Sequence, residues 1–166
     1  ILSKADNTTP GVWYIEAGAM HNDANHISGP SRVGEGSYRC LRAVTKDIDI
    51  NDIAVINTHG TATLYNDEME SIALDRAGLA SVKVNAYKGY LGHTLGAAGV
   101  LECILSMLGI DNGIVLKTLG YESTGVSRLL NIVTENTATD RCMFVKMLSG
   151  FGGSNAAVRL RKEGWK

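Results

Sequence analysis

A lysine and a histidine stand together in a glycine-rich stretch near the middle of the chain. Lys88 precedes His93 by five residues, with Gly89 and Gly92 between them. A short apolar run before this stretch predicts a strand, and the apolar segment 95–110 after it predicts a buried helix. The glycine spacing fits neither G-x-G-x-x-G nor G-x-x-x-x-G-K-S/T, so it gives no nucleotide fingerprint. We therefore predict a functional loop of another kind, in which titratable side chains meet a closely approaching substrate.

A second histidine follows another predicted strand. Residues Ile53–Asn57 form a short apolar run, and His59 lies just after it among small residues. If the fold were to place Lys88 next to both histidines, its positive charge would lower the pKa values of His59 and His93 and keep both rings neutral. The carboxylate of Glu102 falls inside the apolar segment, where an unpaired charge is costly. We expect Glu102 to pair with Lys88 or to contribute to a cation site.

The elements that must position these residues alternate between strands and helices. We predict strands over residues 12–20, 53–57, 82–86, 142–148 and 156–160. We predict helices over residues 32–46, from Asn66 or Asp67 to a stop at Gly78, and over 95–110. Residues 111–140 are weakly patterned. Strands that alternate with helices and end in a strand pair predict an α/β layered fold with a mixed sheet.

Three glycines near the start of the last helix also call for an explanation. Gly92, Gly96 and Gly99 are three and four residues apart, so on one helix they would share a face. Glycine costs about 1 kcal/mol relative to alanine inside a helix. We therefore expect a bare glycine face against which another backbone packs closely.

The composition excludes several classes of protein. The chain has 166 residues, 45% of them hydrophobic and 20% charged, which predicts one globular domain over residues 1–166. A formal net charge of −1 without a Lys/Arg block argues against a nucleic-acid partner. No apolar run reaches the roughly 18 residues of a membrane span. Because the chain opens on Ile1 rather than Met, we expect it to be a piece of a longer product.

Cysteine usage points to a reducing compartment. The three cysteines are an odd number without a C-x-x-C pair, so neither a disulfide framework nor a zinc site is expected, and we predict a cytoplasmic protein. Cys40 and Cys103 fall in predicted helices and Cys142 starts a predicted strand. Cysteines buried without an adjacent base are usually inert. None of the three is therefore expected to act as a nucleophile.

Four segments, in this order and spacing, resemble the C-terminal half of the β-ketoacyl-(acyl carrier protein) synthases, which have the thiolase fold. The segments are 23–30 (DANHISGP), 57–63 (NTHGTAT), 88–93 (KGYLGH) and 150–155 (GFGGSN). The resemblance covers nearly the whole chain and is weakest over residues 117–140. It implies one half of a thiolase-like layered fold.

The resemblance also implies a decarboxylating Claisen condensation in fatty-acid or polyketide synthesis. An acyl group on a cysteine is attacked by the enolate that forms when a malonyl thioester loses CO₂. Both substrates would travel on the phosphopantetheine arm of acyl carrier protein, and no other cofactor is implied. The nucleophilic cysteine of the family belongs to an N-terminal half that this chain does not contain. We therefore expect the isolated chain to be inactive and the parent enzyme to be a homodimer.

The resemblance assigns a role to each of the chemical residues. His59 and His93 match the two histidines whose N–H groups stabilise charge on a thioester oxygen. Lys88 matches the active-site lysine of the family. The backbone N–H of Phe151 would complete an oxyanion hole for the acyl thioester, and its ring would gate the acyl pocket. For His26 we expect a structural hydrogen bond within its loop.

Supporting residues are implied in the same way. Thr61 and Thr63 match threonines that hydrogen-bond phosphopantetheine. Asn57 and Asn155 match positions near the carboxylate of Glu102, and these three residues could together hold a monovalent cation for structural support. No other metal site is expected.

Departures from the family pattern leave the subfamily and the acyl-chain length open. Ala62 stands where Gly or Ser is usual, Gly89 stands where Ser is usual, and Ser149 replaces a bulkier residue. A non-catalytic partner subunit, like the chain-length factors that keep this fold without the nucleophile, is the alternative. Retention of His59, His93 and Lys88 argues against it, because a silent partner has no use for two oxyanion donors. A thiolase would need a second cysteine where this chain has residues 150–153 (GFGG).

Overall fold

The computed structural model describes residues 3–4 and 11–164. The long strands are β1 (Trp13–Asn22), β2 (Ile53–Asn57), β7 (Met143–Gly150) and β8 (Ser154–Lys162). The short strands are β3 (Lys83–Asn85), β4 (Ile114–Val115), β5 (Asn131–Ile132) and β6 (Thr137–Ala138). The α-helices are α1 (Glu35–Thr45), α2 (Leu64–Arg76), α3 (Lys88–Leu91) and α4 (Ala98–Asp111). The 3₁₀ turns are η1 (Ile50–Asp52), η2 (Leu95–Ala97) and η3 (Phe151–Gly153).

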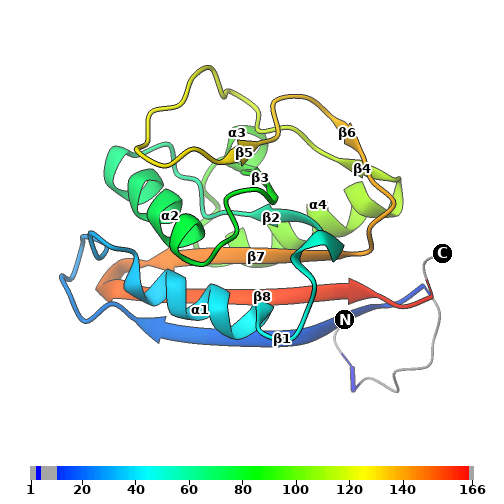
Figure 1. The fold of residues 1–166 in the computed structure, drawn as a ribbon, viewed down its shortest axis with the longest axis horizontal. Coiled ribbons are helices and arrows are strands. Elements are labelled where there is room, and N and C mark those ends of the chain that lie inside the picture. Colours follow the sequence, from blue (N-terminus) through cyan, green and yellow to red (C-terminus); the bar gives the residue numbers. More distant parts are fainter. Residues whose placement is uncertain (1–2, 5–10, 165–166) are drawn as a thin grey trace.

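Six strands form one mixed sheet in the order β1-β8-β7-β2-β3-β5. The pairs β1–β8 and β8–β7 are antiparallel, whereas β7–β2, β2–β3 and β3–β5 are parallel. Strands β4 and β6 form a separate antiparallel pair. Helices α1 and α2 cover one face of the sheet and α4 covers the other (Figure 1). The predicted α/β layered fold with a mixed sheet is confirmed.

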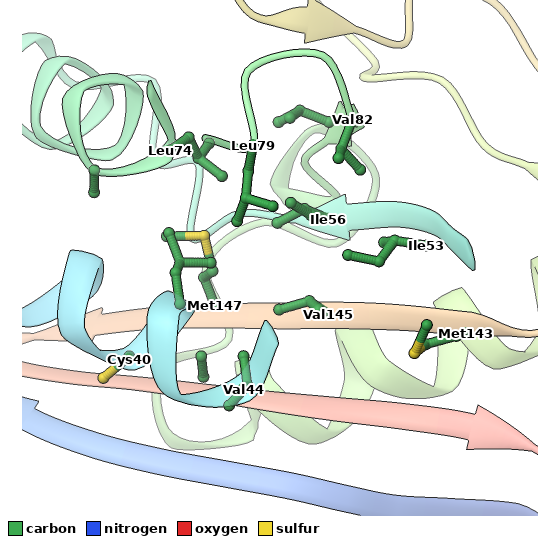
Figure 2. Close-up of a cluster of buried hydrophobic side chains, with 14 residues drawn as sticks. Cys40, Val44, Ile53, Ile56, Leu74, Leu79, Val82, Met143, Val145 and Met147 are labelled. Atoms are coloured by element: carbon green, nitrogen blue, oxygen red, sulfur yellow. The ribbon is translucent and has the colours of Figure 1, made fainter. Parts of the chain in front are cut away.

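Side chains of β7 alternate between the two faces of the sheet. Met143, Val145 and Met147 enter the core beneath α1 and α2 (Figure 2). Phe144 enters the second core, beneath α4. Because successive residues of a strand point to opposite faces, Lys146 shares the α4 face with Phe144. A buried lysine is thereby carried into the interior between the sheet and α4.

The candidate loops meet at one edge of the sheet. Asn57 at the end of β2 lies in register with Asn85 at the end of β3 and with Lys146 in β7. These three strands run parallel, so their carboxyl ends point to the same edge. The residues that follow β2, β3 and β7 therefore gather there.

Two helices begin at other residues than the sequence predicts. Helix α1 begins at Glu35, three residues later than the predicted start at 32, because Gly34 before it has a left-handed φ of +59°. Helix α2 begins at Leu64, with Thr63 as its N-cap residue, rather than after Asn66. The amide of Asn66 donates instead to the hydroxyl of Thr63, at 2.8 Å. Asn66 is therefore not the N-cap residue of α2 but stabilises the loop before the helix through its side-chain hydrogen bonds.

The predicted glycine face is wrong. Gly92 ends α3 with a φ of +69°, Gly96 lies in η2, and only Gly99 belongs to α4. A Cβ at Gly99 would come within 2.6 Å of Leu148 Cδ1 in β7, whereas one at Gly92 or Gly96 would meet nothing within 4 Å. Close packing therefore needs one glycine, and the other two serve the turns before the helix.

Helix α4 is also not the fully buried helix that its composition predicts. Val100, Leu101, Ile104 and Leu108, which we call the apolar face of α4, are 38–66% exposed. The buried side of the helix instead includes the polar Glu102. Helix α4 therefore packs on the sheet through the contacts of Glu102 and through Ile110 and Met107 of the second core, while its apolar face stays uncovered. Within the described residues, none of the helices is long and apolar enough to cross a membrane.

Candidate active site

The two histidines that the sequence singles out lie side by side. The ring centroids of His59 and His93 are 5.2 Å apart, and the rings meet edge to face at 80°. His59 follows β2 and is 6% exposed, whereas His93 follows α3 and is exposed. One ring therefore forms the buried side and the other the open side of a small imidazole pair.

His59 is held in its neutral form. Burial, together with the positive charges of Lys88 and Lys146 and the proximity of His93, lowers its pKa from 6.5 to about 3. Its Nδ1 is buried and has no hydrogen-bond partner within the described residues. The ring is an uncharged imidazole throughout the physiological pH range.

The hydrogen bonding of His93 fixes which nitrogen can donate. Its Nδ1 accepts the backbone N–H of Leu95 at 3.2 Å. In a neutral imidazole one nitrogen accepts and the other carries the proton. The proton of neutral His93 is therefore assigned to Nε2, which leaves an N–H on the exposed ring as a donor.

Lys88 and Glu102 form the first of two buried ion pairs. The Nζ of Lys88 donates to Glu102 Oε1 at 2.8 Å and also to the backbone carbonyl of His59. The side chains of Lys88 and Glu102 are 8% and 1% exposed. This is the first of the two arrangements that the sequence predicts for Glu102. Lys88 thus fastens the backbone of the His59 loop to α4.

Lys146 forms the second pair, and the sequence reasoning missed it. Its ammonium group donates to Asn57 Oδ1 at 2.7 Å, to the carbonyl of Thr58 at 2.7 Å and to Glu102 Oε2. Burial lowers its pKa from 10.5 to about 8, and Glu102 opposes that shift. A lysine in the middle of the apolar run 143–148 was the available signal, because a charge in such a strand needs a partner.

The predicted cation set of Asn57, Glu102 and Asn155 does not come together. Oδ1 of Asn155 accepts the hydroxyls of Ser37 and Ser149 at 2.8 Å each, and its Nδ2 donates to the carbonyl of Gly153 at 3.0 Å. Asn57 and Glu102 do share a positive group, but it is a lysine ammonium. Asn155 thus stabilises the β7–β8 turn. Asn57, Glu102 and Asn155 therefore do not fit a shared site for a monovalent cation.

A second missed residue holds the His59 loop from its other side. The carboxylate of Glu70, in α2, accepts the backbone N–H groups of His59 at 2.6 Å and Gly60 at 2.8 Å. Glu70 is 3% exposed, and burial raises its pKa. Its spacing of three and four residues from Ala73 and Leu74, which are buried in the same helix, was the signal that could have found it.

The two threonines expected to contact phosphopantetheine lie on the rim of the same loop. The hydroxyls of Thr61 and Thr63 are 2.8 Å apart, and the amide of Asn66 donates to both. Thr63 is exposed and Thr61 partly so. Their hydroxyls are therefore ordered and open to a ligand that passes over the rim.

Phe151 lies in a separate turn at the same edge of the sheet. Its ring is 87% exposed, and the next residue, Gly152, has a φ of +78°. The N–H of Gly152 donates to the carbonyl of Ile27 at 2.6 Å, and its carbonyl accepts from Asn22 Nδ2 at 2.7 Å. The segment after β1 thus holds the turn, while the aromatic ring stands free of the buried cluster.

His26 has the loop contact that the sequence predicts. Its Nδ1 accepts the backbone N–H of Ser28 at 3.2 Å. The carboxylate of Asp23 in the same segment accepts the N–H groups of Ser31 at 2.9 Å and Gly36 at 2.7 Å. Hydrogen bonds of this loop thus connect β1 to the start of α1.

The cysteines have the properties of inert thiols. All three are free. Burial raises the pKa of Cys103 to about 11 and also raises that of Cys40. Because the thiolate is the reactive form, a raised pKa suppresses nucleophilic attack.

Comparison with known proteins identifies the family. The family model described as "Beta-ketoacyl synthase, C-terminal domain" matches residues 13–122. The chain is 36% identical over 150 residues to 3-oxoacyl-(acyl-carrier-protein) synthase 2 of Rhizobium meliloti, covering 86% of this chain and 35% of that protein. It is 36% identical over 147 residues to synthase 1 of Escherichia coli K12, covering 87% of this chain and 35% of that protein. The chain thus spans about a third of the length of these relatives.

Solved structures agree with this assignment. The ishigamide ketosynthase/chain length factor matches with a TM-score of 0.82 and 31% identity, covering 90% of this chain and 38% of that one. A ketosynthase in complex with its chain length factor from Xenorhabdus doucetiae matches with a TM-score of 0.83 and 26% identity, covering 93% and 40%. The chain belongs to the β-ketoacyl synthases, as a member of their C-terminal domain family.

Proposed function

We propose that this chain is the C-terminal catalytic half of a 3-oxoacyl-(acyl carrier protein) synthase that acts in fatty-acid or polyketide synthesis. The observation that carries the proposal is the imidazole pair of His59 and His93, with ring centroids 5.2 Å apart. One ring is kept neutral by its surroundings, and the other presents an Nε2–H at the open side. Two imidazoles this close together can both offer N–H groups to one oxygen on which negative charge develops.

The reaction that such donors serve is the decarboxylation of a malonyl thioester. The bond between the carboxylate and the adjacent CH₂ breaks, CO₂ leaves, and the electron pair passes to the thioester oxygen as an enolate. N–H groups of His59 and His93 stabilise that oxygen. The enolate carbon then attacks the acyl thioester on a cysteine, and the carbon–sulfur bond breaks to release the cysteine thiolate. That cysteine belongs to the complete enzyme and not to this chain.

The buried charges keep the donors in place. Lys88 and Glu70 hold the backbone of the His59 loop at its carbonyl and N–H sides. Positive charge on Lys88 also helps to keep His59 unprotonated. We assign to Lys88 the role of positioning residue in the decarboxylation.

The substrate arm and the partners follow from the same proposal. Thr61 and Thr63 present ordered hydroxyls for the phosphopantetheine arm of acyl carrier protein. The N–H of Phe151 serves the acyl thioester, and its exposed ring closes the acyl pocket. The apolar face of α4 would be covered by the missing N-terminal half, in an enzyme that forms a homodimer. One matched structure contains a ketosynthase with an acyl-carrier protein.

We place the complete enzyme in the cytoplasm, on the basis of the three free cysteines. A relative from Schizosaccharomyces pombe, 30% identical over 174 residues, is named a putative mitochondrial synthase. Localisation of the tagged complete protein tests this assignment.

A chain-length-factor-like partner subunit is the second candidate, because two of the matched structures contain a chain length factor. If the chain were such a partner subunit, replacement of His59 or His93 would leave turnover unchanged. In the complete enzyme, His59→Ala and His93→Ala should each lower CO₂ release from malonyl thioester by about a hundredfold to a thousandfold. Acylation of the cysteine should persist in both variants. CO₂ release at the parent rate in both would overturn the catalytic assignment.

The isolated chain provides a further test. Incubated with acyl- and malonyl-carrier thioesters, it should form no 3-oxoacyl product above a blank, because the nucleophile is not among its residues. Turnover by these 166 residues alone would contradict the assignment as a half.

A further inference from the structure

We propose that the ammonium group of Lys146 takes the place of a bound potassium or sodium ion beneath the histidine loop, so that this chain positions the loop without a metal ion. The proposal concerns a residue to which the condensation chemistry above gives no step. It rests on the contacts of the buried group and requires no condensing activity for its test.

Three oxygen atoms from two strand-end residues and one helix converge on a single point. They are Oδ1 of Asn57, the backbone carbonyl of Thr58 and Oε2 of Glu102. Asn57 and Thr58 are at most 6% exposed, and Glu102 is 1% exposed. Acceptors gathered out of water are costly unless a donor or a cation satisfies them. Oxygen sets of this kind, including backbone carbonyls, are what replaces the water shell of a potassium ion.

The ammonium of Lys146 satisfies all three oxygens at once. A lysine carries three N–H donors and no acceptor, and each donor has one of the three acceptors as its partner. The side chain is 1% exposed. A metal ion and the ammonium group cannot both bind these three oxygens. The positive charge at this point is therefore part of the chain itself and not a dissociable ion.

The two oxygens of Glu102 have different positive partners. Oε1 of Glu102 is already bound by Lys88, which leaves Oε2 to a second positive partner. Asn155, which would otherwise complete an oxygen set with Asn57 and Glu102, is engaged with Ser37 and Ser149. The three acceptor oxygens therefore have hydrogen-bond donors when Lys146 is present and lack them when it is removed.

The test compares the effect of potassium on the unfolding midpoint of three variants. Lys146→Ala empties the point and leaves its oxygens in place. Lys146→Met removes the charge but fills the space with an apolar chain of similar length. Lys46→Ala, at an exposed lysine, is the control for loss of a lysine elsewhere. Each protein is heated in potassium chloride and in tetramethylammonium chloride at equal ionic strength, up to about 0.2 M.

We expect potassium to raise the midpoint of Lys146→Ala by about 3 °C or more relative to tetramethylammonium, because an ion that binds only the folded state stabilises it. The parent, Lys146→Met and Lys46→Ala should show no such difference. A thallium NMR signal, with Tl⁺ as a potassium substitute, should show binding to Lys146→Ala alone.

Two results would overturn the proposal. One is a potassium-dependent midpoint in the parent, which would mean that an ion binds beside Lys146. The other is an equal potassium response in the alanine and methionine variants. If Lys146→Ala does not fold, the potassium dependence of the parent's unfolding midpoint still tests the proposal. Lys146→Ser then replaces Lys146→Ala as the variant in which the ammonium is gone and its space is free for an ion. None of these readouts depends on the catalytic assignment.

Discussion

The carboxylate of Glu70 accepts the backbone N–H of His59 at 2.6 Å, which ties α2 directly to the loop after β2. The second oxygen of the same carboxylate accepts the N–H of Gly60 at 2.8 Å. Because these two hydrogen bonds hold the backbone at His59 and Gly60, they also restrict the direction of the His59 side chain. The orientation of the imidazole is therefore set from a helix and not from the loop alone.

Glu70→Gln should loosen this loop. The glutamine amide offers one acceptor oxygen and places an NH₂ group opposite the second N–H, so a buried donor is left unpaired. We expect a loss of about 1–3 kcal/mol in the free energy of unfolding. Hydrogen exchange at the amides of His59 and Gly60 should become faster.

The control for this change is Glu68→Gln, two residues earlier, where the carboxylate accepts from Ser127 at an exposed position. That variant should stay within about 0.5 kcal/mol of the parent. Unchanged exchange at His59 and Gly60 in Glu70→Gln would show that the carboxylate does not hold the loop.

Acid should destabilise the fold through His59. Its pKa is about 3 in the folded chain and has its ordinary value of 6.5 in the unfolded chain, so the unfolded state binds more protons between these values. The free energy of unfolding should fall as pH drops from about 6.5 toward 3, by at most about 1.4 kcal/mol per pH unit from this group. His59→Asn should flatten that part of the profile, whereas His21→Asn, at an exposed histidine of β1, should leave it unchanged. Urea titrations over this pH range measure both slopes, and equal slopes in parent and His59→Asn would refute the assignment.

Removal of the shared carboxylate should cost far more than removal of a surface one. Glu102→Gln leaves the buried ammonium groups of Lys88 and Lys146 without their negative partner. We expect a loss of about 3–5 kcal/mol in the free energy of unfolding. Glu35→Gln breaks the half-exposed pairs to Arg39 and Arg76 and should cost less than about 1 kcal/mol. Denaturant unfolding of the two variants side by side gives the comparison, and similar losses would mean that the buried pairs contribute little.

The apolar face of α4 should cause self-association of the isolated chain. Val100 is 66% exposed and Leu108 is 53% exposed on one helix, and exposed apolar patches mark interfaces or aggregation sites. Sedimentation velocity should show concentration-dependent oligomers, and the double variant Val100→Glu/Leu108→Lys should shift them toward monomer. Leu129→Lys, at an 83% exposed leucine outside the helix, is the matched control. A parent that sediments as a clean monomer and binds no apolar dye would contradict this prediction.

Short apolar runs were enough to predict the long strands of the sheet. Strand β2 has the predicted bounds Ile53–Asn57, β8 contains the predicted segment 156–160, and β7 contains all of the predicted segment 142–148 except its first residue. These are segments in which apolar pattern and burial agree. The 142–148 run also contains Lys146, whose buried partners come from β2, the loop after it and α4, so the strand pattern alone did not reveal its role.

The prediction failed for α4 because composition does not say which side of a helix meets the sheet. Its apolar residues suggested full burial, but the contacts of Glu102 with two lysines turn the polar side inward. Those lysines come from α3 and β7, and no local pattern reveals that they meet. The same limit applies to Asn155, whose partners Ser37 and Ser149 come from different elements.

The strand order has a consequence for how the protein is made. Strand β8 lies between β1 and β7, so Trp13 near the beginning of the chain pairs with Lys162 near its end. On the ribosome β1 emerges long before its neighbour, and at about 5–20 residues per second it waits roughly ten seconds for β8. Until then the sheet side of α1 has no complete surface on which to dock. We expect this part of the nascent chain to be most vulnerable to proteases and most in need of chaperones during this interval, which ends when β8 joins the sheet.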